Sequence, residues 1–183
     1  MTDDVTPLDD WLKELYAELQ GSDRACAVIA AVTLDDSLKV ILQKHLLPAR
    51  KPKEDGLLGR SGVVDTFSAR IELAFRLGLI TDKVKDALDD LRDIRNLAAH
   101  RARFSFSIDA VAERVRRVDA AMEPNARLPQ GLIQELGDSL KSRFVASALL
   151  LALALEYASS ETPQVRAATQ DYLSLKLRWK LVE

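Results

Sequence analysis

The chain has 183 residues, of which 48% are hydrophobic and 30% charged, as is typical of a soluble globular protein. Its formal net charge of −2 excludes a global basic field of the kind that attracts nucleic acid. The single cysteine, Cys26, excludes an internal disulfide and a cysteine-ligated zinc site. Because Cys26 lies in a stretch rich in alanine and valine, we expect a buried thiol.

No signal peptide is predicted, because aspartates occupy the N-terminal positions where such a peptide needs basic residues. The longest apolar run, residues 144–155, is shorter than the ~20 residues that cross a bilayer. We therefore expect a cytoplasmic protein that does not enter a membrane.

Apolar residues recur at helical spacing along almost the whole chain, and short segments with glycine or proline separate the periodic stretches. Sustained alternation of the kind that marks a strand is absent from the sequence. The expected helices comprise residues 8–19, about 22–47, 64–77, 81–100, 107–122, about 132–158 and 163–181. We therefore predict an all-α fold, a single-domain bundle of about six or seven helices over residues 1–183.

Two segments stand out from this pattern. The helix at about 132–158, which Gly137 could interrupt, is apolar all round from Phe144, so several neighbours or a subunit interface should cover it. The segment 48–63 holds two prolines and three glycines, and we expect a flexible, basic, solvated loop there. His45, just before this loop, is expected to be a partly buried histidine at a helix end.

The segment 92–100, RDIRNLAAH, carries the densest group of reactive side chains. At about 100° per residue, Asp93 and His100 lie almost in line on one helix face, with Asn96 between them. Arg95 is displaced by about 140° from His100 and lies on the apolar stripe, so it should point into the bundle or a dimer seam. A buried arginine needs a carboxylate partner. The candidates for a structural ion pair with it are Glu72, Asp35 and Asp36.

An alternative interpretation makes the same side chains catalytic. A histidine can transfer a proton and an arginine can stabilise a pentavalent phosphate, which together suffice for metal-independent RNA cleavage. The R-x4-H spacing with Asn after Arg resembles the motif of the HEPN superfamily of small α-helical RNases, in which the motifs of two subunits converge at a dimer interface. The residues concerned would be Arg95, Asn96 and His100.

A helix-turn-helix spacing overlaps this region. Ala74, Gly78 and Val84 have the Ala-x3-Gly-x5-Val pattern. The presumptive DNA-reading helix, however, opens with four acids and two bases within residues 82–90, and those acids would face phosphates. We therefore prefer a packed helical hairpin to DNA reading by this element.

Three blocks of sequence resemble the mannitol operon repressor family in residues, order and separation. They are SDRACAVIAAVTLDDSLKVIL, FSARIELAFRLGLI and LRDIRNLAAH, within residues 22–100. Residues 101–183 match less clearly and are expected to be supporting helices. The resemblance implies an all-helical cytoplasmic bacterial protein and, by the family's name, a negative regulator of a sugar-alcohol uptake operon. Repression through a protein partner is consistent with it.

We predict a non-enzymatic regulator that binds a protein or nucleic-acid partner, forms a homodimer and uses no metal or cofactor. Its expected binding surface lies within residues 92–117, where seven arginines against three acids give a local net charge of +4. The arginines expected to bind are Arg92, Arg101, Arg103, Arg114, Arg116 and Arg117. The alternatives are the metal-independent RNase and a non-catalytic scaffold protein.

Overall fold

Helices account for most of the residues that the computed structural model describes, which are 7–51, 55–122, 128 and 136–167. No strand occurs among these residues. Within this described part of the chain the helices are α1 (Pro7–Leu19), α2 (Asp23–His45), α3 (Phe67–Arg76), α4 (Asp82–His100), α5 (Asp109–Ala121) and α7 (Leu140–Glu161). The predicted all-α bundle is confirmed.

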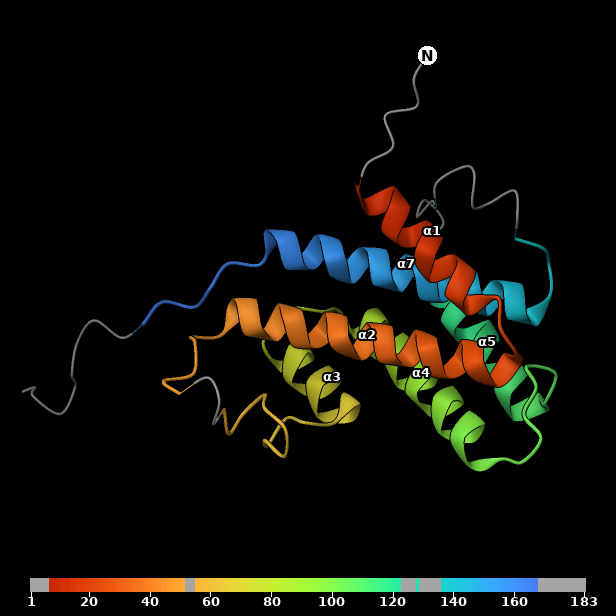
Figure 1. Cartoon of the computed structure of the whole chain (residues 1–183), viewed down its shortest axis with the longest axis horizontal. Helices are drawn as coiled ribbons and strands as arrows, with labels where there is room; N and C mark the ends of the chain where they lie inside the picture. The colour runs from red at the N-terminus through yellow and green to blue at the C-terminus, as the bar shows by residue number, and fades with distance from the viewer. Residues whose placement is uncertain (1–6, 52–54, 123–127, 129–135, 168–183) are drawn as a thin grey trace, which may run out of the picture.

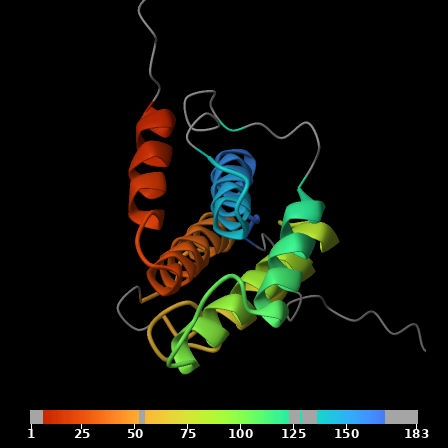
Figure 2. The same cartoon turned by 90° about the vertical axis from the view of Figure 1, so that its right-hand side faces the viewer.

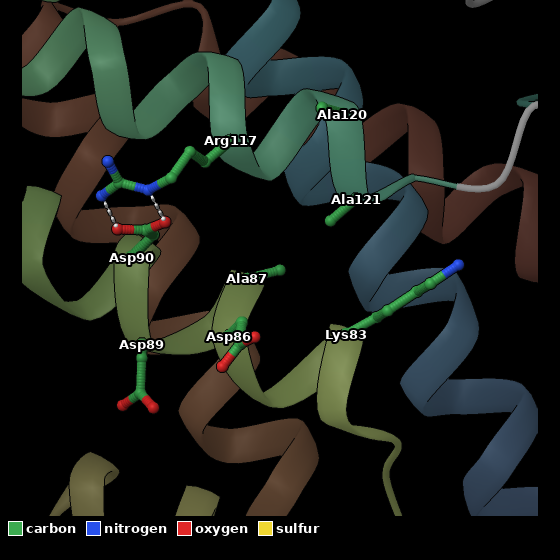
Figure 3. A pocket seen from close by; sticks show the side chains of 8 residues that line it. All are labelled: Lys83, Asp86, Ala87, Asp89, Asp90, Arg117, Ala120 and Ala121. Carbon is green, nitrogen blue, oxygen red and sulfur yellow. Dashed lines mark hydrogen bonds and ion pairs between the residues drawn. The ribbon is translucent and has the colours of Figure 1, made fainter.

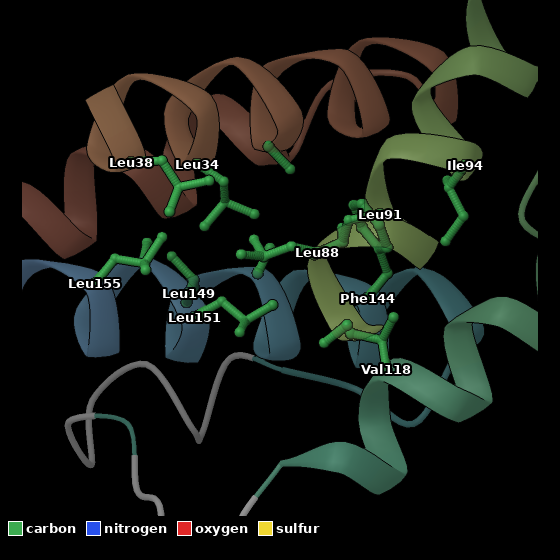
Figure 4. Close-up of a cluster of buried hydrophobic side chains, with 14 of the residues drawn as sticks. Leu34, Leu38, Leu88, Leu91, Ile94, Val118, Phe144, Leu149, Leu151 and Leu155 are labelled. Carbon is green, nitrogen blue, oxygen red and sulfur yellow. The ribbon is translucent and has the colours of Figure 1, made fainter. Parts of the chain in front are cut away.

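The two longest helices, α2 and α7, lie side by side along the long axis of the molecule (Figure 1). An end-on view shows α7 surrounded by α1, α2 and α5, with α3 and α4 packed on α2 (Figure 2). Fully buried aliphatic side chains of α2, α4 and α7 meet in the centre (Figure 4). Among them are Leu34, Leu38, Leu88, Leu91, Leu149 and Leu155.

The central position predicted for the apolar helix is confirmed by α7. By length and composition α7 could span a membrane, with a mean hydropathy of 1.4 over 18 residues. Half of that window is buried inside the protein. Contacts with α1, α2 and α5 therefore explain why both sides of α7 are apolar.

Cys26, on the inner side of α2, is a buried thiol as predicted. It has no exposed surface, and this burial raises the pKa of the thiol to about 12. The thiolate would lose its hydration at this position, so the neutral thiol is the stable form at physiological pH. A buried neutral thiol is chemically inert.

Four helices begin after a hydroxyl residue whose side-chain oxygen accepts a hydrogen bond from the backbone N–H three residues on. These N-caps are Ser22, Thr66, Thr81 and Ser139. One predicted boundary is corrected by the caps, since the third helix starts at Phe67 instead of residue 64. The interruption expected near Gly137 is confirmed, because residues 136–139 are not helical and α7 begins at Leu140. Residues 129–135 lie outside the described part of the chain.

The turn between α3 and α4 is closed as the sequence predicts. Gly78 has a φ of +71°, and the Leu79 N–H donates to the Ala74 carbonyl oxygen at 2.9 Å. The two helices pack against each other as a hairpin. The exposed side chains at the start of α4 include Asp82 and Asp86, which supports hairpin packing over DNA reading.

The segment before α3 is held by its own hydrogen bonds, although the sequence suggested a flexible loop. Val64 N–H donates to the Leu57 carbonyl at 2.9 Å, and Gly62 N–H donates to the Gly59 carbonyl at 3.0 Å. A Cβ atom at Gly59 would lie 2.3 Å from the backbone oxygen of Asp55. Glycine is therefore required for this close approach of two backbone segments.

The chain leaves α7 by crossing the C-terminal end of α2. His45 Nδ1 donates to the Pro163 carbonyl oxygen at 2.8 Å, and the Val165 N–H donates to the His45 carbonyl at 2.7 Å. His45 is partly buried, as predicted. Residues 163–167 are not helical, so the last predicted helix does not start at residue 163. Its remaining residues, 168–183, lie outside the described part of the chain.

A buried ion pair ties α3 to α2. Nη1 of Arg70 lies 2.6 Å from Oδ2 of Asp35, and Arg70 is only 7% exposed. Nη2 of the same guanidinium donates to the backbone oxygen of Asp65 at 2.9 Å. Because a buried guanidinium is stable only with such partners, this pair fixes where α3 begins and how it lies on α2.

We expect Arg70→Met to lower the free energy of unfolding by about 3 kcal/mol, because it leaves the half-buried carboxylate of Asp35 without its cation. Urea unfolding followed by circular dichroism measures this change. The matched control is Arg76→Met on the same helix, whose contact with Glu72 is 3.9 Å long and largely exposed. This variant should cost less than about 0.5 kcal/mol. Equal losses in the two variants would contradict a special role for Arg70.

Candidate interaction surface

Arg95, Asn96 and His100 lie on the C-terminal half of α4. The structure brings Arg95 and Asn96 together, since Arg95 Nη1 donates to Asn96 Oδ1 at 3.1 Å. His100 is the exposed last residue of the helix, where the helix dipole favours a cation. Arg95 is also exposed. Arg95 therefore does not point into the bundle, and its other predicted place, a dimer seam, stays a prediction.

Arg95 is exposed because α4 is longer than the helix that covers it. Nη1 of Arg92 donates to Oγ of Ser68 at 3.0 Å, and Ser68 is the second residue of α3. The two helices run in opposite directions as a hairpin, so the part of α4 after Arg92 extends past the start of α3 (Figure 1). The apolar stripe of α4 indicates in which direction a side chain points. It does not indicate where the covering helix α3 begins.

The carboxylates predicted to pair with that arginine lie elsewhere. Asp35 pairs with Arg70 in the buried contact described above. Glu72 Oε2 lies 3.7 Å from Lys85 Nζ on α4. Asp36 is exposed on α2. A buried pair of the predicted kind is therefore present, but it uses Arg70 instead of Arg95.

The six arginines predicted to bind a partner divide into two groups. Arg92, Arg114 and Arg117 form ion pairs with aspartates of α4. The other three, Arg101, Arg103 and Arg116, are exposed and have no ion-pair partner among the residues that the structure describes.

Asp90, which is 15% exposed, is the central carboxylate between α4 and α5. Arg117 binds it with two nitrogens, and the Nε–Oδ2 distance is 2.8 Å (Figure 3). Arg114 Nε lies 3.7 Å from the same carboxylate. The hydrogen bond that Arg117 donates to Asp90 raises the pKa of Arg117 further above its ordinary value. The α4–α5 contact thus combines charge with the fixed geometry of a guanidinium.

These contacts belong to a longer chain of alternating charges that joins α3, α4 and α5. Each side chain lies within 3.7 Å of the next. In order, this charge network comprises Glu72, Lys85, Asp89, Arg92, Asp93, Arg114, Asp90, Arg117 and Glu113. Because five anions face four cations, its arginines are already neutralised and offer no net positive charge to a phosphate.

A groove of about 540 Å³ lies between the first half of α4 and the end of α5. In Figure 3 the Asp90–Arg117 pair lies at one end of it and Lys83 at the other, with Asp86 between them. Alanine side chains form the apolar part of the wall. The lining residues are Lys83, Asp86, Ala87, Asp89, Asp90, Arg117, Ala120 and Ala121.

The groove has the chemistry of a binding surface. Its lining contains no histidine, cysteine or hydroxyl side chain that could act as a base or nucleophile. Among the described residues, no three His, Cys, Asp or Glu side chains gather closely enough to hold a metal ion. Three aspartates, two cations and small apolar side chains fit a protein segment with both basic and apolar groups.

Sequence reasoning missed the groove and the charge network. Aspartates recur at positions 86, 89, 90 and 93, and arginines recur at 114 and 117 on the next helix. Helical spacing places each set on one side of its helix, which is a detectable signal. The pairing across two helices was not detectable, because it depends on how α5 lies against α4.

The described geometry can be compared with known proteins. No family model matches the sequence, and no curated protein matches it. Its fold is similar to that of MtlR, the mannitol operon repressor, in the X-ray structure of the MtlR-HPr complex from Escherichia coli. The chain shares this fold. The match has a TM-score of 0.62 at 19% sequence identity and covers 82% of this chain and 99% of that chain.

We expect Asp90→Asn to lower the free energy of unfolding by about 1–2 kcal/mol, because Arg114 and Arg117 both lose their shared anion in a partly screened contact. Glu113→Gln removes the exposed end of the same network and should cost less than about 0.5 kcal/mol. Thermal and urea unfolding of both variants measure the difference. A neutral effect of Asp90→Asn would show that the network does not stabilise the α4–α5 contact.

Proposed function

We propose that this protein is a non-catalytic bacterial regulator that acts by binding a protein partner, in the manner of the mannitol operon repressor. The observation that supports the proposal is the similarity of this fold to that of MtlR. The X-ray structure of MtlR is that of a complex with HPr. The sequence resemblance over residues 22–100 points to the same family. The cytoplasmic location and the homodimer remain predictions.

Two features of the surface favour a protein partner for the α4–α5 face. The charge network neutralises Arg92, Arg114 and Arg117, so the face that the sequence marked as basic has no excess of positive charge. Beside it, the groove presents the exposed carboxylate of Asp86 next to apolar alanine side chains. Association of proteins uses this combination of a charged rim and a desolvated apolar centre.

We expect the purified protein to bind HPr from the same bacterium, and we place the contact at the α4–α5 groove. Asp86→Lys should weaken binding by about tenfold or more, because it replaces an exposed anion by a cation facing a basic partner group. Isothermal titration calorimetry measures the affinity. The control is Asp36→Lys, which reverses an exposed carboxylate on α2, away from the groove, and should leave the affinity within about twofold.

The two parts of this proposal fail separately. No binding of HPr by the unmodified protein would contradict an MtlR-like partner. Binding that is equally strong in Asp86→Lys would keep the partner but exclude the groove as its site.

We expect no RNA cleavage, because Arg95 donates a hydrogen bond to Asn96 and, among the described residues, no contact joins Arg95 to His100. The measurement is incubation of total bacterial RNA with the purified protein in the presence of EDTA, followed by gel electrophoresis. His100→Ala and Arg95→Ala are run beside it. Cleavage by the unmodified protein that both variants lose would establish the RNase alternative and displace the regulator.

A further inference from the structure

The part of the chain after the charge network has the opposite electrostatic character. From Ile94 to Ile108 the sequence contains three arginines and one histidine and no acidic residue. Arg95, Arg101 and Arg103 are all exposed, and none has an ion-pair partner within the described residues. Before Asp93, Lys85 and Arg92 are neutralised by ion pairs with Asp89, whereas the three arginines after it have no such pair within the described residues.

The backbone that carries these cations is firmly held. The guanidinium of Arg24, on the first turn of α2, donates to the carbonyl oxygens of Arg101 and Ala102, the second at 2.9 Å. Oδ2 of Asp23 accepts the N–H of Phe106 at 3.2 Å. The loop after α4 is therefore fixed across the start of α2, and its arginine side chains extend into solvent from a rigid support.

An aromatic ring lies in the same loop. Phe104 is partly buried, and its ring packs edge-on against Phe106 with a centroid distance of 5.6 Å. Phe106 is fully buried and packs in turn on Phe144 at 4.7 Å. The Phe104 ring is thus anchored to the core while part of it faces solvent, next to Arg103 in the chain.

We propose that this basic corner, formed by Arg95, Arg101, Arg103 and Phe104, binds single-stranded nucleic acid. The arginines would contact phosphates, and the ring of Phe104 would stack on a base. Anchored aromatic rings beside unpaired cations are the usual means by which proteins hold single strands without reading their sequence. An acidic protein segment would satisfy the arginines but would leave the aromatic ring without a matching partner.

The corner is distinct from the groove at the first half of α4. A protein partner in the groove and a nucleic-acid strand at the corner use different side chains. The two sites can therefore be tested with separate variants.

The test is fluorescence anisotropy with labelled single-stranded RNA and DNA dodecamers between about 50 and 200 mM salt. The unmodified protein should bind and should lose affinity as salt rises. Arg101→Glu/Arg103→Glu should weaken binding about tenfold or more and reduce the salt slope by about 1.4, because two phosphate contacts are lost. Phe104→Leu should weaken binding about fivefold with an unchanged salt slope.

The matched control is Arg116→Glu, another exposed and unpaired arginine within the described residues, on the outer side of α5. It should leave the affinity within about twofold. Circular dichroism verifies that each variant is folded, and Arg103→Glu alone replaces the double variant if that one is unstable. Comparison of the RNA and DNA arms shows which strand is preferred, and either preference supports the proposal.

Three results would overturn the inference. One is the absence of binding by the unmodified protein at about 50 mM salt. Another is an equal loss in Arg116→Glu, which would reduce the effect to overall charge. The third is binding of a labelled polyglutamate peptide through Arg101 and Arg103 without binding of either nucleic acid, which would assign the corner to an acidic protein.

Discussion

The contact between Arg70 and Asp35 determines how the rest of this bundle is arranged. A guanidinium at 7% exposure is stable only where a carboxylate and a carbonyl meet it, and that requirement sets the position of α3 on α2. The start of α3 in turn determines how much of α4 is covered. This single buried ion pair thus sets the boundary between the part of α4 that α3 covers and the part that it leaves open.

On the two sides of that boundary, α4 has different chemistry. Along its first part, aspartates every three or four residues face cations of α4 and α5, and the resulting network is close to neutral. Beyond Asp93 the acids end while the arginines continue. The net charge of the segment, +4 over residues 92–117, therefore conceals a neutral face and a basic corner. These are suited to different partners, because free cations are what phosphates require.

The sequence was sufficient for those features that depend on a helix alone. Helical periodicity predicted the all-α bundle, the tight turn at Gly78 and the central position of α7, because each follows from side chains on one element. It failed where two elements must be placed together. Arg70 and Arg95 both lie on apolar stripes, yet only Arg70 is buried, since it pairs with Asp35 where α3 packs on α2, whereas α4 extends past α3.

The hydrogen bonds between His45 and the segment after α7 determine where the C-terminal part of the chain emerges. That point is at the end of α2, whose 23 residues span about 34 Å, and the basic corner lies at the opposite end of the same helix. A dye, affinity tag or surface tether attached to the chain after Val165 therefore starts from the end of the molecule farther from the corner.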